Sequence, residues 1–246
     1  MGRGNKRRLS DDEKLQVTEF MEAKSDKKFE KKSVVVKGFS ARTDKQAELV
    51  QLIEEKEIVI AVGLAGSGKS YCAIATALSL LPSGYEKIIL VKSVITLPGE
   101  EIGFLKGNLL EKMEPFMMSY TWNIDKIAGY GSAKDFIDKG LVQVLPIAYI
   151  RGLSIDNSII IVDEAQNLTS HKFKSIITRL GANSKYIFLG DIEQVDIKKK
   201  SESCLAEMID IFKDSNFIGT VEFTDEDCVR NPLIPKILEK LRERNI

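Results

Sequence analysis

The chain has 246 residues, of which 36 are Lys or Arg, 36 are Asp or Glu, and 43% are hydrophobic. A net charge of zero argues against a protein whose whole surface is strongly basic and binds nucleic acid. The apolar content suffices for a sizeable core. No apolar run reaches the roughly 18 residues of a transmembrane helix, and the charged N-terminus lacks the apolar core of a signal peptide. We therefore expect a cytoplasmic protein with no membrane partner.

The cysteines and the single histidine do not form a pattern that is typical of a metal site or a disulfide framework. Cys72, Cys204 and Cys228 are odd in number and far apart, which fits neither a zinc site nor paired disulfides. His171 lies in a polar stretch and is predicted to be a solvated helix residue.

Positive charge is concentrated at the N-terminus. Residues 1–32 contain ten Lys or Arg and seven Asp or Glu, a net charge of +3, which leaves −3 for the remainder. We predict a flexible arm over residues 1–32 and one domain over 33–246. Two interpretations of the arm stay open: a disordered solubilising tail, or a segment that contacts nucleic-acid phosphates.

Apolar runs of strand length alternate with helical segments along residues 33–246. The predicted strands cover residues 33–39, 58–62, 88–91, 141–146, 158–162, 186–190 and 217–223. The predicted helices cover residues 45–55, 69–81, 170–181, 201–213 and 232–245, the first with Thr43 or Asp44 as its N-cap. This alternation predicts an α/β domain of three layers, α/β/α, with a mostly parallel central sheet.

The middle of the chain is less regular. Residues 100–122 are predicted to be irregular and then helical, and residues 123–133 are predicted to be a loop because they are polar and contain two glycines. A stripe at helical spacing is assigned to the core or an interface; it consists of Met113, Phe116, Met117 and Tyr120.

A phosphate-binding loop follows the strand 58–62. The pattern G-x-x-x-x-G-K-[ST] is matched in full by Gly63, Leu64, Ala65, Gly66, Ser67, Gly68, Lys69 and Ser70. Small residues let successive backbone N–H groups point at the β-phosphate, and the helix that begins at Lys69 adds its positive dipole end. Lys69 is predicted to reach the β- and γ-phosphates, and the Ser70 hydroxyl to ligate Mg²⁺. With the following Tyr71, these residues form the predicted site for ATP or a close relative.

Carboxylates at the end of the strand 158–162 supply the second half of a hydrolytic site. Asp163 is predicted to bind Mg²⁺ directly or through water, and Glu164 to act as the general base. Two more polar residues, Asp191 and Gln194, follow the strand 186–190, and ligands bind outside the carboxyl ends of parallel strands. Gln194 is a candidate to sense the γ-phosphate or orient the water. The alternative is a capped turn in which Asp191 bonds to the N–H groups that follow it.

These motifs together resemble superfamily-1 helicase cores and, more closely, the phosphate-starvation-inducible PhoH-like NTPases. The resemblance covers roughly residues 40–240, in the segments TDKQAELV (43–50), GLAGSGKSY (63–71), LVKS (90–93), GEEIGFLKGNLLEKMEPF (99–116), IAYIRG (147–152), IIIVDEAQN (159–167), TRLG (178–181), GDIEQVD (190–196) and FTDEDCVRNPLI (223–234). It implies a single RecA-like domain that binds and hydrolyses ATP and has a role in RNA metabolism.

The resemblance also implies roles for two further residues. Gln46 looks like the Q-motif glutamine that reads adenine, and Arg230 looks like the helicase arginine that meets the γ-phosphate. For Arg230 the alternative is a surface salt bridge with one of the acidic residues 225–227.

The predicted function is Mg²⁺-dependent ATP hydrolysis coupled to RNA or single-stranded nucleic acid. One RecA-like domain has half the machinery of a monomeric helicase, so we expect a homo-oligomeric ring, such as a hexamer. A neighbouring subunit would then supply an arginine finger, for which Arg151, Arg179 and Arg230 are the candidates. Two alternatives stay open: an ATP-driven switch or scaffold without a nucleic-acid partner, and a small-molecule kinase, although the chain lacks an Arg-rich lid.

Overall fold

The computed structural model describes residue 36 and residues 39–93, 109–150, 155–197, 199–231 and 233–244. The strands are β1 (Ile58–Val62), β2 (Lys87–Lys92), β3 (Val142–Pro146), β4 (Ser158–Asp163), β5 (Lys185–Gly190) and β6 (Ile218–Glu222). The helices are α2 (Asp44–Glu55), α3 (Lys69–Leu80), α4 (Leu109–Ala128), α5 (Ser132–Asp138), α6 (Ile147–Ile150), α7 (Ser170–Ile177), α8 (Leu205–Phe212) and α9 (Leu233–Arg242). The predicted arm over residues 1–32 lies outside the described residues, as does most of the strand predicted over residues 33–39.

The six strands form one sheet in the order β3-β2-β4-β5-β1-β6, and every neighbouring pair is parallel. The chain therefore crosses from one half of the sheet to the other between β1 and β2, and returns between β4 and β5. The inner strands β1, β2, β4 and β5 each contain a continuous apolar run because helices cover both of their faces. The predicted three-layer α/β/α architecture is confirmed.

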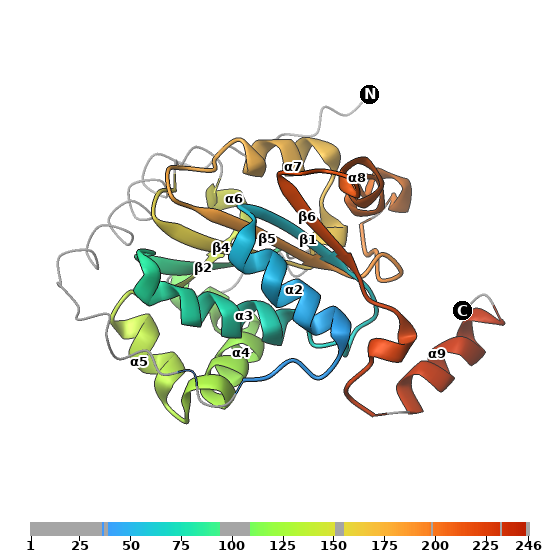
Figure 1. The fold of residues 1–246 in the computed structure, drawn as a ribbon, viewed down its shortest axis with the longest axis horizontal. Helices are drawn as coiled ribbons and strands as arrows, with labels where there is room; N and C mark the ends of the chain where they lie inside the picture. Colours follow the sequence, from blue (N-terminus) through green and yellow to red (C-terminus); the bar gives the residue numbers. More distant parts are fainter. Residues whose placement is uncertain are drawn as a thin grey trace.

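Helices cover both faces of the sheet (Figure 1). Alternating side chains of the strands contribute to two separate cores, one on each face. In β1, Val59 and Ala61 face the layer of α2, α3, α4 and α5, whereas Ile60 and Val62 face the layer of α6, α7 and α8. Since both faces of the sheet are buried, the edge formed by the strand ends is left open for a site.

The helix α2 begins as its sequence predicts, whereas the loop predicted over residues 123–133 is wrong. Thr43 is the N-cap of α2, and its side chain accepts a hydrogen bond from the backbone N–H of Gln46. The helix α4 continues to Ala128 because Ile124 and Ile127 extend the apolar stripe of Tyr120 by one and two turns, and all three are buried. Only residues 129–131 separate α4 from α5, which the sequence did not predict.

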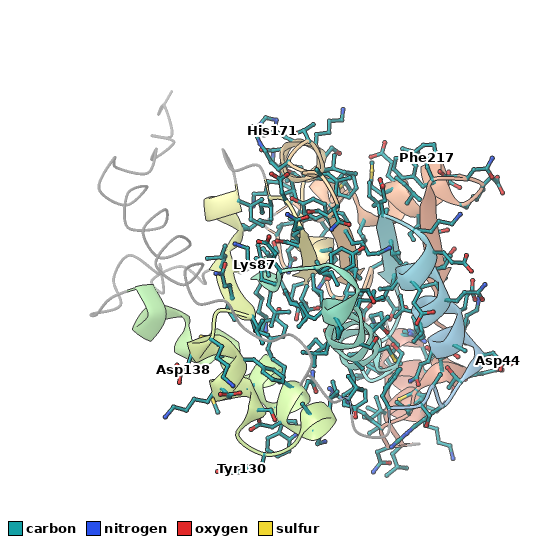
Figure 2. The ribbon with its side chains drawn as sticks, turned by 60° about the vertical axis from the view of Figure 1, so that its left-hand side comes forward. Asp44, Lys87, Tyr130, Asp138, His171 and Phe217 are labelled. Carbon is teal, nitrogen blue, oxygen red and sulfur yellow. The ribbon has the colours of Figure 1, made fainter. Side chains whose placement is uncertain are left out.

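Two further predictions, for residues 201–213 and for His171, can be compared with the structure. The helix predicted over 201–213 is a 3₁₀ turn, Lys200–Glu202, followed by α8. His171 lies exposed on α7, as predicted, and Figure 2 shows it at the outer surface of the molecule. In the described part of the chain, no helix is both long and apolar enough to cross a membrane.

Candidate functional site

A cavity of about 560 Å³ opens at the carboxyl ends of β1, β4 and β5. Most of the predicted site residues line it, namely Gln46, Ala65, Gly66, Gly68, Lys69, Ser70, Tyr71, Asp163, Glu164, Gln194 and Arg230. The other three residues of the predicted loop, Gly63, Leu64 and Ser67, lie behind this lining, and the latter two are buried. The fold therefore collects residues from five separate segments of the chain around one space.

The loop between β1 and α3 is held tightly against the end of β6. At Gly63, φ is +139° and a Cβ atom would lie 2.4 Å from the carbonyl oxygen of Phe223, so only glycine fits there. The backbone N–H of Val229 donates to the carbonyl of Gly66 over 3.1 Å, which braces the other side of the loop. Its shape is therefore fixed by the fold around it.

The ammonium group of Lys69 is bound to the loop itself. Its Nζ donates to the carbonyls of Gly63 and Leu64 over 2.6 and 2.9 Å and to the Ser67 hydroxyl over 3.1 Å. Burial lowers the pKa of Lys69, and the carboxylates of Asp191, Asp163 and Glu164 oppose that shift. Lys69 is thus a cation held at the centre of an anion-binding loop.

The ends of α3 and β4 bring a hydroxyl and a carboxylate together. Ser70 Oγ lies 3.4 and 3.5 Å from the two carboxylate oxygens of Asp163, which is longer than a good O–H···O hydrogen bond. Burial, reinforced by the neighbouring Glu164 carboxylate, raises the pKa of Asp163 above its ordinary value. Paired hard oxygen ligands in a site that disfavours an isolated negative charge suit a divalent cation.

Glu164 adopts a left-handed backbone conformation, with φ 56° and ψ 39°. That conformation is uncommon for residues other than glycine, asparagine and aspartate, and it turns the chain sharply out of β4. The Glu164 carboxylate accepts a hydrogen bond of 2.7 Å from Nε2 of Gln166, a buried neighbour to which the sequence analysis assigned no role.

Asp191 joins the end of β5 to the phosphate-binding loop. Its Oδ2 accepts from the backbone N–H of Ala65 over 3.0 Å, and its Oδ1 accepts from the N–H of Glu193 over 3.0 Å. The capped turn weighed as an alternative is therefore present, and the same side chain also contacts the loop. The turn places Gln194 at the wall of the cavity.

Gln46 and Arg230 flank the loop from opposite ends of the chain. Gln46 Nε2 donates to the carbonyl of Ser67 over 2.8 Å, and its Oε1 accepts from the backbone N–H of Arg42 over 2.8 Å. The Arg230 side chain packs against Gly66, where a Cβ atom would lie 3.1 Å from Arg230 Cδ.

The arginine candidates have different positions relative to the cavity. Among the described residues no ion pair involves Arg230, and Asp225, one of its predicted partners, is instead paired with Arg242. Arg179 follows α7 and does not line the cavity, and Arg151 lies outside the described residues.

The helix α4 contributes a wall of the cavity that the sequence analysis missed. This wall consists of Ser119, Tyr120, Trp122, Asn123 and Lys126, and Lys92 at the end of β2 adds a further cation. The Tyr120 hydroxyl is buried without a well-formed hydrogen bond among the described residues; burial raises its pKa well above the ordinary value, and Asp163 adds to that shift. The helical spacing of Tyr120 indicated burial, but it could not indicate which residue lies opposite.

A parallel sheet with a phosphate-binding loop after β1 and an Asp–Glu pair after β4 defines a P-loop nucleoside triphosphatase with a RecA-like fold. Comparison with known proteins narrows this class. The PhoH-like protein family model matches residues 39–242, so the chain belongs to that family, and the resemblance inferred from the sequence is confirmed.

Individual relatives cover most of this chain but are longer than it. The PhoH-like protein of Bacillus subtilis is 35% identical over 210 residues, which are 85% of this chain and 66% of the relative. Protein PhoH of Escherichia coli is 33% identical over 201 residues, 80% of this chain and 56% of the relative. Among solved structures, the UvsW helicase from bacteriophage T4 covers 89% of this chain and 68% of its own, with 13% identity and a TM-score of 0.48. That last likeness is too distant to bear on function.

Proposed function

We propose that the chain binds ATP with Mg²⁺ in this cavity and hydrolyses it. The observation that carries the proposal is the convergence of Lys69, Ser70, Asp163 and Glu164 on one space at the carboxyl ends of parallel strands. Each is the residue type that phosphoryl transfer to water requires at that place: a cation, a metal-binding hydroxyl and carboxylate, and a base.

The phosphate chain would be bound by the backbone N–H groups of the loop and by Lys69. At present the loop carbonyls accept the hydrogen bonds of the Lys69 ammonium, and phosphate oxygens would replace them as acceptors. Ser70 and Asp163 would hold Mg²⁺, which supplies charge neutralisation to the phosphates when bound. Because Ser70 and Asp163 supply only part of the octahedral shell that Mg²⁺ demands, phosphate oxygens and water would complete its coordination.

In the hydrolytic step, Glu164 would take a proton from a water molecule while the water oxygen forms a bond to the γ-phosphorus. The bond between that phosphorus and the β–γ bridging oxygen breaks, and ADP leaves with that oxygen. Gln194, on the cavity wall, would orient the water or contact the γ-phosphate. An arginine would stabilise the charge that develops there, either Arg230 of the same chain, which lines the cavity, or an arginine of a neighbouring subunit.

We propose further that ATP hydrolysis is coupled to the binding of RNA or single-stranded nucleic acid. Trp122 supports this, because it is 65% exposed at the rim of the cavity and Lys126 Nζ lies 5.2 Å from the centre of its ring. An exposed aromatic ring beside a cation is the chemistry that stacks bases and neutralises phosphates. The alternative, an ATP-driven switch or scaffold, predicts ATPase activity that added RNA or DNA leaves unchanged.

A ring of identical subunits is the assembly that we propose. The helix α9 supports it, because Leu233 and Ile237 are 59% and 56% exposed one turn apart, and Figure 1 shows α9 beside the sheet rather than over it. Exposed apolar stripes of this kind mark contacts between proteins. Arg151, Arg179 and Arg230 are the candidates for a finger that reaches the neighbouring site. A monomer with ATP bound and full turnover in native mass spectrometry would refute the ring.

Two variants test the hydrolytic site directly. Lys69→Ala should abolish nucleotide binding or turnover, whereas Glu164→Gln should bind ATP and hydrolyse it about 10²–10⁴-fold more slowly, the usual worth of general base catalysis. Trp122 is the only tryptophan of the chain and lines the cavity, so its fluorescence reports binding separately from turnover. Normal hydrolysis by Glu164→Gln would show that Glu164 is not the base. Steady-state assays with and without RNA and single-stranded DNA test the partner.

A further inference from the structure

The amide of Gln166 bridges three segments that meet behind the cavity. Gln166 is 0% exposed and lies two residues after Glu164, in the turn that follows β4. Its Nε2 donates to Glu164 Oε2 over 2.7 Å and to the backbone carbonyl of Gln194 over 3.1 Å. Its Oε1 accepts from the backbone N–H of Asp191 over 3.1 Å. Both hydrogens of the amide and one oxygen lone pair are therefore used.

The end of β5 is shaped to receive this amide. A Cβ atom on Gly190 would lie 2.4 Å from Leu205 Cδ2, 2.8 Å from Gln166 Oε1 and 3.0 Å from the Gln166 backbone nitrogen, so any side chain there would collide with both residues. Gly190 is not in a left-handed conformation, so space rather than backbone freedom explains the glycine. The Ser203 hydroxyl holds the same turn from behind, because it donates to the Gln166 carbonyl over 2.7 Å.

The hydrogen bond from Gln166 to Glu164 occupies only one of the two carboxylate oxygens. Among the described residues, Gln166 Nε2 is the one donor bound to the Glu164 carboxylate, and it uses Oε2. The other oxygen has no partner in the described part of the chain and can take a proton from water. A hydrogen bond to a carboxylate is strong and directional, so it restrains a side chain that otherwise rotates about three bonds.

We infer that Gln166 is a positioning residue of the hydrolytic site, which holds the Glu164 carboxylate and the Gln194 segment in a fixed relation. The inference rests on the proposed function, because it takes Glu164 as the base. Gln166 itself does not line the cavity, so it acts through Glu164 and Gln194 rather than on the nucleotide.

The test is Gln166→Met, which keeps the length of the side chain and removes its donors and acceptor. We expect kcat to fall about tenfold to a hundredfold, the usual effect of losing a group that orients an active residue. The affinity for ATP, measured by Trp122 fluorescence, should stay close to that of the parent chain. Gln166→Leu, which also removes the donors and the acceptor without adding a charge beside Glu164, should likewise lower kcat and leave the affinity for ATP unchanged, and it serves if the Met variant does not fold.

Asn167→Leu is the matched control. Asn167 is also buried in this turn and binds the Gln194 side of the site, since its Oδ1 accepts from the backbone N–H of Asp196 over 2.9 Å, but it does not contact Glu164. We expect its kcat to exceed that of Gln166→Met. An equal loss in both variants would show that the turn needs only general support and would overturn the inference.

A double-mutant cycle separates this inference from the proposed function. If Gln166 acts through Glu164, Gln166→Met should slow a Glu164→Gln background far less than it slows the parent chain. Full additivity of the two losses, or an unchanged kcat in both Gln166 variants, would refute the positioning role. Normal hydrolysis by Glu164→Gln alone would instead refute the proposed function.

Discussion

The contact between Gln46 and the phosphate-binding loop leads to a prediction that separates two roles for this residue. Gln46 is buried, and its amide is bound at both ends to main-chain groups, the carbonyl of Ser67 and the N–H of Arg42. A Cβ atom on Gly68 would lie 2.7 Å from Gln46 Nε2, so the amide is also packed against the loop. We predict that Gln46→Ala weakens the binding of ATP and GTP equally, because the loop that it supports binds phosphates.

The size of the effect follows from the Ser67 carbonyl, which loses its hydrogen-bond donor in the Gln46→Ala variant. The Ser67 carbonyl is buried, and leaving such a group without its donor costs about 1–3 kcal/mol. If the substitution destabilises the loop conformation that binds phosphate by about 1.4 kcal/mol, the dissociation constant for the nucleotide rises about tenfold. The free energy of unfolding should fall by a similar amount.

Equilibrium titration of ATP and GTP, followed by Trp122 fluorescence, is the measurement. Gln51→Ala is the matched control, because Gln51 lies on the same helix and its amide binds the exposed Glu55 side chain over 2.8 Å. That control should bind both nucleotides as the parent chain does. A loss of ATP affinity with GTP affinity unchanged would refute the support role and favour adenine recognition by Gln46.

Two further predictions concern the loop and the thiols. Gly63→Ala should lower the thermal unfolding midpoint much more than Gly131→Ala. Both glycines have positive φ, but only at Gly63 would a Cβ atom meet a backbone oxygen, at 2.4 Å. Equal shifts in differential scanning calorimetry would contradict this prediction. Cys228 should be the only thiol that N-ethylmaleimide modifies in the native chain, since burial raises the pKa of Cys72 to about 12 and of Cys204 to about 11, and mass spectrometry of modified peptides checks it. ATP should protect Cys228, whose sulfur packs beside the phosphate-binding loop; rapid modification of either buried thiol would contradict the burial argument.

The sequence predicted which edge of the sheet bears the cavity because the signals there are local. A continuous apolar run that stops at Asp163 or Gly190 fixes both a buried strand and its carboxyl end, and parallel strands place those ends together. The order of the strands was not predictable in this way, since a buried run such as Ile58–Val62 does not indicate its neighbours.

The residues that were missed depend on contacts between distant segments. Tyr120 was assigned to a stripe at helical spacing, and only the packing of α4 against the sheet brings its hydroxyl beside Asp163. Gln166 was visible as a neutral polar residue directly after the acidic pair, but its role requires β5 to deliver Asp191 and Gln194 to the same place. The glycines at 129 and 131 indicated a turn correctly, yet the polar residues before them belong to α4.

The left-handed backbone of Glu164 has a consequence for how this chain can change over time. A glutamate held at φ 56° costs roughly 1–2 kcal/mol relative to an ordinary helical or extended residue, and glycine would avoid most of that cost. Substitutions that relax this turn would therefore stabilise the folded state while removing the carboxylate from the cavity. If Glu164 is the base, as proposed, selection for thermal robustness and selection for turnover act in opposite directions at this one position, and a redesign for stability alone would discard the proposed base.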